Sequence, residues 1–244
     1  MKITKKTRWQ LPIFAQVFML ALVASLILAN CELDPGPGPG GGGDGALGAS
    51  LNLSGQVYVY DWRNYNYVIF TGNRQVVSAM GHGGSGSITN GQLSFSIGTP
   101  SNLLSSDWAY NEFFEGLNNV RINPTSTRFA FLELRTFPGD YYVSRENFVT
   151  SRTGNVEVTT YEELIYIYVD RDVNIRADRT VHTEWDYSSI VDAFNLNLKT
   201  GWNAFIVNGR AEYNLQTERQ SETITVSVGN PGNHLRWVLS EPLW

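Results

Sequence analysis

From Leu51 onward, apolar and polar residues alternate along much of the chain. Residues 92–97, 193–198 and 223–228 each place apolar side chains on one face and mainly Ser, Thr or Asn side chains on the other. A period of two predicts half-buried β-strands, with one face toward a core and one toward water. The same pattern predicts further strands at residues 56–60, 68–71, 74–79, 128–135, 164–169, 172–177, 202–207 and 235–239.

Turn-forming residues separate many of these segments. They include Asn90-Gly91, Thr200-Gly201, Asn208-Gly209 and Asn230-Pro231-Gly232. Short turns of this kind connect antiparallel strands. We therefore expect an all-β fold, mainly an antiparallel β-sandwich, over residues 51–244. Two small related β-modules are the alternative, because VYVYD at residues 57–61 is echoed by IYIYVD at residues 165–170.

One segment has the period of a helix instead. Tyr110, Phe113, Phe114 and Leu117 follow the spacing i, i+3, i+4 and i+7, and residues 105–107 can cap the helix start. A second short helix is expected near residues 187–193. Both would cover an edge or an end of the strands.

The N-terminal part of the chain is a different kind of sequence. A basic segment, MKITKKTR, leads into an apolar run over residues 11–29, which ends just before Cys31, the single cysteine. This order is typical of a secretory signal peptide, here residues 1–30, which does not belong to the folded domain. Residues 31–50 are so rich in Gly and Pro that they are expected to form a flexible linker.

The segment SLILANC at residues 25–31 resembles the lipobox of bacterial lipoprotein signal peptides. Leu28, Ala29 and Cys31 match its pattern, and Asn30 matches the relaxed lipobox of spirochaete-type lipoproteins. The resemblance implies lipid attachment at Cys31, a membrane as partner, and an extracytoplasmic position in the cell envelope, periplasmic or surface-exposed. An uncleaved membrane anchor and a released soluble protein are the alternatives.

A second resemblance covers residues 163–208. The stretches ELIYIYVDRDVNIRA and FNLNLKTGWNAFIVN are similar to the C-terminal portion of uncharacterised spirochaete-type lipoproteins, and this likeness implies no activity. Locally, the second stretch predicts a hairpin. Leu196 and Leu198 would enter the core, Gly201 would permit the turn, and Trp202 would begin the returning strand.

Charge excludes one class of partner. The whole chain carries a formal charge of −5, and residues 31–244 carry −9 because the first 30 residues contain four basic and no acidic residues. Nucleic-acid binding that is independent of sequence requires a basic surface, so no nucleic-acid partner is expected.

Histidine-based chemistry has little support in the sequence. His82 lies in GHGGSGS, close to Ser85 and Ser87, but the GxSxG turn of esterases is absent and the segment is expected to be a loop. The three histidines share no HxH or HxxxH spacing. We therefore expect neither a metal nor a cofactor.

Paired carboxylates are the remaining catalytic candidates, because glycoside hydrolysis requires two of them about 5 to 9.5 Å apart. The sequence offers three pairs: Glu162 with Glu163, Asp170 with Asp172, and Glu184 with Asp186. The first pair would point to opposite faces of a strand, and the other two are expected to be solvated. An envelope carbohydrate-active enzyme that uses paired carboxylates is therefore the alternative function.

Aromatic residues in DWRNYNY, residues 61–67, are the best candidates for binding. Trp62, Tyr65 and Tyr67 lie among polar groups, and this combination suits a carbohydrate ring or a protein partner. A hairpin loop whose aromatic rings pack on the edge of the sheet is the alternative interpretation. The sequence thus favours a membrane-anchored envelope lipoprotein with a non-catalytic binding or structural β-domain.

Overall fold

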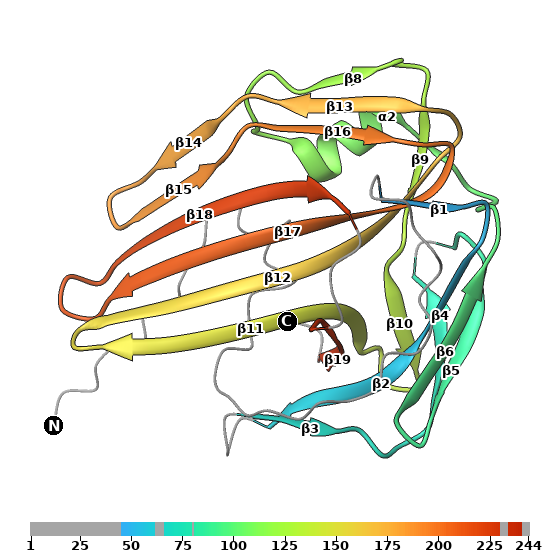
Figure 1. Cartoon of the computed structure of the whole chain (residues 1–244), viewed down its shortest axis with the longest axis horizontal. Helices are drawn as coiled ribbons and strands as arrows, with labels where there is room; N and C mark the ends of the chain where they lie inside the picture. Colours follow the sequence, from blue (N-terminus) through green and yellow to red (C-terminus); the bar gives the residue numbers. More distant parts are fainter. Residues whose placement is uncertain (1–44, 62–65, 80, 230–233, 241–244) are drawn as a thin grey trace, which may run out of the picture.

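Strands dominate the computed structural model, which describes residues 45–61, 66–79, 81–229 and 234–240 (Figure 1). Sixteen strands in this part of the chain join into one large mixed sheet, and three form a small separate sheet. The predicted all-β class is therefore confirmed. A simple two-layer sandwich is not, because most strands belong to one continuous, curled sheet. No helix among the described residues is long and apolar enough to cross a membrane.

The large sheet contains strands from both halves of the described chain. Its members are β1 (Ala46–Gly48), β2 (Leu51–Asp61), β3 (Asn66–Ile69), β4 (Arg74–Ser78), β5 (Ser85–Thr89), β6 (Gln92–Ile97), β7 (Leu104–Ser105), β9 (Arg128–Phe131), β10 (Leu134–Phe137), β11 (Tyr142–Thr153), β12 (Val156–Val169), β14 (Thr180–Thr183), β15 (Tyr187–Val191), β17 (Gly201–Asn214), β18 (Arg219–Val228) and β19 (Arg236–Ser240). Neighbouring strands are antiparallel except in the β15–β18 and β2–β19 pairs, which are parallel.

Part of this sheet closes on itself. The strand order β10-β4-β5-β6-β2-β19-β11 returns to its start, because β10 also pairs with β11. Residues of alternate positions on these strands fill the ring with apolar side chains, as period-two alternation requires. They include Leu53, Val57, Val76, Ile88, Leu93, Phe95, Leu134, Val143, Trp237 and Leu239.

The long strands β12 and β17 separate two hydrophobic cores. On β12, Tyr166 and Tyr168 face the core of the strand ring, whereas Ile167 and Val169 face the second core. A strand buried on both faces has a continuous apolar run rather than an alternating one. This explains why residues 164–169 lack polar positions.

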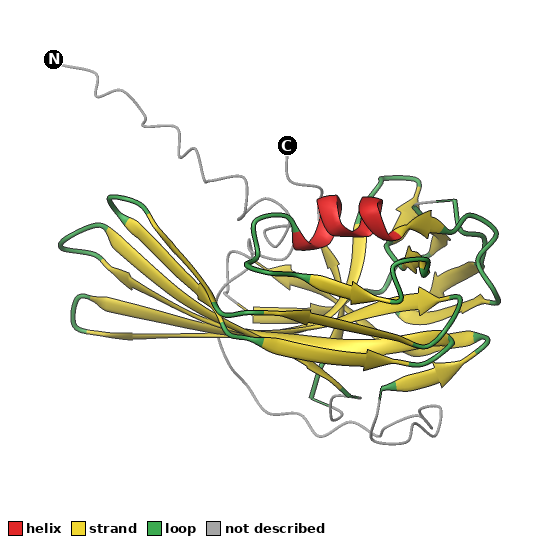
Figure 2. Cartoon of the chain, turned by 90° about the horizontal axis from the view of Figure 1, so that it is seen from above, coloured by secondary structure: helices red, strands yellow, loops and turns green. Residues whose placement is uncertain are grey.

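The small sheet and one helical segment cover the second core. The small sheet has the order β16 (Phe194–Leu198), β13 (Val173–Ala177) and β8 (Arg121–Asn123). The helical segment begins as α2 (Ser106–Ala109), capped by Ser105, and continues as the π-helix η2 (Tyr110–Phe114). Figure 2 shows it beside the strands, with the long hairpins of the large sheet extending away from it.

The predicted helix at residues 110–117 is confirmed in part. Phe114 and Leu117 are buried in the second core and Phe113 packs against it, but Tyr110 is exposed. The wider i→i+5 turn of the π-helix changes which positions share a face. The second helix, near residues 187–193, was predicted wrongly, because Tyr187–Val191 is strand β15 and pairs with β14 and β18.

Two local predictions also differ from the structure. Strand β1 lies within residues 31–50, the predicted linker, and pairs with β17. The stretch around Gly201 is not a hairpin, because β16 pairs with β13 whereas β17 pairs with β12. Gly201 does adopt a left-handed φ of +105° at the turn, and Leu196, Leu198 and Trp202 are buried as expected.

Candidate functional site

A three-way strand junction in the large sheet creates a cavity between the two cores. Strand β12 pairs with β11 over the first part of its length and with β9 at its end, while β10 pairs with the beginning of β11. Between its pairing with β11 and its pairing with β9, strand β12 diverges from both of these strands. The register pairs that border the gap are Arg145 with Leu164, Phe131 with Ile167, and Leu134 with Val143.

The cavity at this junction has a volume of about 180 Å³. Its walls are mainly apolar and come from both cores and from the helical segment. Among the lining residues are Phe113, Phe114, Leu117, Phe131, Leu134, Leu164, Ile165, Phe194, Phe205, Val207, Val226 and Trp237. An engineered cavity of about 150 Å³ with comparable apolar walls binds benzene, so a space of this size can hold one small ring compound.

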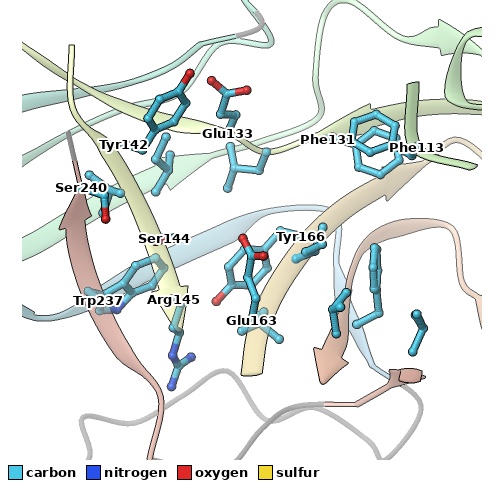
Figure 3. Close-up of a pocket in the computed structure, with 18 of the residues that line it drawn as sticks. Phe113, Phe131, Glu133, Tyr142, Ser144, Arg145, Glu163, Tyr166, Trp237 and Ser240 are labelled. Atoms are coloured by element: carbon cyan, nitrogen blue, oxygen red, sulfur yellow. The ribbon is translucent and has the colours of Figure 1, made fainter. Parts of the chain in front are cut away.

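Aromatic packing holds the helical segment over the cavity. The rings of Phe113 and Phe131 are stacked, with centroids 3.4 Å apart and planes inclined by 17° (Figure 3). Trp108 meets Phe113 edge to face at a centroid distance of 5.6 Å. These contacts fix η2 against β9 and form one wall of the cavity.

Glu163 brings a carboxyl group into this apolar space. On β12 it shares a face with Tyr161, Ile165 and Ile167, so its side chain points toward the second core. Figure 3 shows the carboxyl in the middle of the lining side chains. Among the described residues, no hydrogen bond or ion pair reaches it.

A second carboxyl lies directly across the strand pair. Glu146 on β11 is the register partner of Glu163 and is 4% exposed. Burial raises the pKa of Glu163 to about 7. Burial, and then the charge of Glu163, raise the pKa of Glu146 to about 8, although a hydrogen bond from Ser144 Oγ to Glu146 Oε2 (2.7 Å) acts in the opposite direction. Near neutral pH, the pair therefore retains protons that ordinary carboxyls would have lost.

Arg145 does not neutralise this pair. It is the register partner of Leu164 and Trp237, so its side chain leaves the opposite face of the sheet from Glu163. Its guanidinium carbon lies 5.8 Å from the centroid of the Trp237 ring, and its Nε is buried without a hydrogen-bond partner among the described residues. In Figure 3 the side chain runs away from the Glu163 carboxyl.

Polar side chains lie at another side of the cavity. Arg135 donates to Glu133 (Nε to Oε1, 2.6 Å), to both carboxylate oxygens of Asp140 (3.2 Å) and to the hydroxyl of Tyr142 (2.6 Å). Glu133 and Tyr142 both line the cavity and point to the same side in Figure 3. Because Arg135 already holds these groups, they form a fixed polar margin.

A third buried carboxyl, Glu222 on β18, is satisfied by two tyrosines. The hydroxyls of Tyr161 and Tyr187 each donate to one of its oxygens, both at 2.9 Å. Tyr161 reaches it from β12 by lying over Gly209 of β17, where any Cβ would meet the ring. Burial and the nearby Glu222 raise the pKa of Tyr161, so its hydroxyl remains a donor.

The sequence-predicted binding residues lie elsewhere or outside the described part of the chain. Cys31, Trp62 and Tyr65 are outside the described residues. Tyr67 is on β3, where its ring lies 5.4 Å from the guanidinium of Arg236, which also contacts Tyr58. Tyr67 therefore packs at the sheet edge, far along the strand order from β12.

The sequence-predicted carboxylate pairs do not converge. Glu162 pairs with His234 on the face opposite to Glu163. The carboxylates of three remaining acids have separate partners: Asp170 pairs with Arg171, Asp172 accepts hydrogen bonds from Lys199 and Thr200, and Glu184 contacts His182. For Asp186, the backbone carbonyl accepts a hydrogen bond from the backbone N–H of Gln220. The carboxyls that do converge are those of the half-buried Glu163 and the buried Glu146, a combination that the sequence analysis missed.

His82 does not assemble a nucleophile with its neighbouring serines. It is 2% exposed and burial lowers its pKa, whereas Ser85 and Ser87 are exposed, and no hydrogen bond joins them to it within the described chain. The predicted loop ends early, because β5 begins at Ser85. No group of three His, Cys, Asp or Glu side chains in the described part of the chain is arranged to hold a metal ion.

The fold and the site define an all-β protein with a partly open, mainly apolar cavity, into which the half-buried Glu163 brings a carboxyl group. Comparisons with protein-family models, curated proteins and solved structures give no match to the chain.

Proposed function

We propose that this chain is a lipid-anchored protein of the bacterial cell envelope whose β-domain binds a small, mainly apolar ligand. The observation that carries the binding function is the cavity at the junction of β9, β11 and β12. A close-packed interior has few voids larger than a water molecule, so a cavity of about 180 Å³ with aromatic and aliphatic walls supports the binding of a small ligand.

The test of binding compares two variants of similar chemistry. Calorimetric titration with toluene is expected to show binding to the wild-type chain and at least a tenfold loss in Val226→Phe, because the larger ring fills the cavity that Val226 lines. Val149→Phe is the matched control, since Val149 is 42% exposed and does not line the cavity. Absence of toluene binding to the wild-type protein would contradict the proposal.

The anchoring part of the proposal rests on the sequence alone. Leu28, Ala29 and Cys31 support lipid attachment, and acyl chains contribute about 0.8 kcal/mol per buried methylene toward holding a domain at a membrane. Radiolabelled palmitate should enter the wild-type protein in cells and not Cys31→Ser. Equal labelling of both proteins would refute lipidation.

A carbohydrate-active enzyme has one observation in its favour, the paired carboxyls Glu146 and Glu163. The cavity walls oppose this function, because they offer few partners for sugar hydroxyls, and Glu146 does not line the cavity. Hydrolysis of chromogenic glycosides by the wild-type chain, abolished in Glu163→Gln, would establish the enzyme instead of the binding protein.

A further inference from the structure

The position of Glu163 restricts the chemistry of the ligand. Its carboxyl enters the cavity from β12, directly opposite Val207 of β17, which in turn pairs with Val226 of β18. Apolar side chains therefore flank the acid on one side of its strand. On the other side lies Glu146, another acid.

The nearest cations in the sheet lie over aromatic rings rather than beside Glu163. Arg145 is on the opposite face and lies over Trp237. Arg236 is the register partner of Glu146, but its guanidinium lies over the rings of Tyr58 and Tyr67. The titratable groups that interact electrostatically with Glu163 are Glu146 and the phenol of Tyr161. The Tyr161 hydroxyl donates its hydrogen bond to Glu222. Arg145 also lines the cavity, but it comes from the opposite face of β11, and within the described residues no ion pair neutralises the Glu163 carboxyl.

Burial of a charged group is unfavourable unless an opposite charge or hydrogen-bond donors compensate for it. A protonated amine supplies both, since an ammonium group is a cation with up to three donors. An anionic ligand would be repelled by the ionised form of Glu163. A neutral apolar ligand would fill the space but would leave the acid uncompensated.

We infer that the cavity selects a small apolar amine, a single ring or short branched chain whose ammonium group pairs with the Glu163 carboxylate. This inference rests on the proposed binding function and names its ligand class. Benzylamine has the required combination of one ring and one ammonium group. The ring would contact apolar lining residues such as Phe131, Phe205 and Val226, and the ammonium would lie against Glu163.

Pairing with an amine also requires a proton to leave the site. Because burial raises the pKa of Glu163 to about 7, part of the population is protonated at neutral pH, and an ammonium group binds the deprotonated form. Binding should therefore release a fraction of a proton per amine at pH 7. Affinity should increase from pH 6 to pH 8, where benzylamine itself remains a cation.

The experiment is a calorimetric comparison of benzylamine with benzyl alcohol, which has nearly the same shape but no charge. For the wild-type chain at pH 7.5, we expect benzylamine to bind at least tenfold more tightly than benzyl alcohol. In Glu163→Gln this preference should disappear, while benzyl alcohol still binds and so demonstrates an intact cavity. Glu157→Gln, on the same face of β12 but outside the cavity, should retain the wild-type preference.

Different failures have different meanings. If benzyl alcohol binds the wild-type protein as tightly as benzylamine, or if Glu163→Gln retains the amine preference, the amine inference is wrong and the proposed binding function survives. If neither compound nor toluene binds the wild-type chain, the proposed function fails as well. Titration in two buffers of different ionisation enthalpy measures proton release, and no release at pH 7 would also contradict pairing with Glu163.

Discussion

The inward-facing carboxyls of Glu146 and Glu163 make the stability of the fold depend on pH in an unusual direction. Glu163 has a pKa of 4.5 in the unfolded chain and about 7 in the folded protein. A carboxyl whose folded pKa is raised retains its proton in the native state after the unfolded state has lost it. The native state then binds more protons, so stability decreases as the pH rises from about 4.5 to about 7.

The size of this effect follows from the pKa difference. One pKa unit corresponds to about 1.4 kcal/mol, so Glu163 alone accounts for a loss of about 3 kcal/mol across this pH range. Glu146, with a folded pKa of about 8, extends the loss to higher pH. Such a loss is large because small domains are stable by only about 5 to 15 kcal/mol.

The variant Glu163→Gln removes one titrating group and the charge that acts on Glu146. Between pH 5 and pH 8, the free energy of unfolding should decrease in both proteins. The decrease should be about 3 kcal/mol smaller in Glu163→Gln than in the wild-type chain. Urea denaturation at pH 5, 6, 7 and 8 measures this difference, and Glu157→Gln provides the control on the same strand. Parallel pH profiles for the wild type and Glu163→Gln would refute the reasoning.

Three further predictions concern the packing around this pair. Gly209→Val should lower the free energy of unfolding by about 2 to 4 kcal/mol, because the new side chain displaces Tyr161 from Glu222. Gly98→Ala, where a Cβ meets open space, should change the free energy of unfolding little. Equal effects of the two variants would contradict a role for the Tyr161–Glu222 contact. Tyr187→Phe should lower the free energy of unfolding by about 1.5 to 3 kcal/mol, because the hydrogen bond to Glu222 is lost. Thermal denaturation of this variant and of the control Tyr213→Phe, which should be nearly neutral, measures the difference. Phe131→Ala should cost about 3 to 5 kcal/mol by removing the stack with Phe113, and a loss below 1 kcal/mol in chemical denaturation would show that η2 is held by other contacts.

Local patterns predicted much of the secondary structure. The alternation over residues 92–97 corresponds to β6, because one face of that strand is buried and the other is exposed. The prediction near residues 187–193 failed because Ser188 and Ser189 weaken the alternation, and pairing with the distant β18 makes the segment a strand.

The strand ring and the cavity depend on pairings between residues far apart in sequence. Nothing local indicates that β10 contacts both β4 and β11, or that β12 exchanges β11 for β9 along its length. Tertiary pairing of this kind is set by the packing of whole faces rather than by local propensity.

One member of the site did have a readable signal. Glu163 lies two residues before Ile165, so alternation places it on the same face of the strand as Ile165, Ile167 and Val169. This face points inward. Glu146 similarly precedes Phe148 by two residues. That these two acids face each other was inaccessible to sequence reasoning, because it depends on the register between β11 and β12.

The most direct test of ligand binding in the cavity is a crystal structure of the chain under xenon pressure. Xenon occupies apolar cavities of this size, so an anomalous peak is predicted between Phe131, Val207 and Val226 in the wild-type protein. The same peak should be absent from Val226→Phe. A wild-type structure with no xenon at the junction of β9, β11 and β12, or with side chains collapsed into that space, would contradict the proposed binding function.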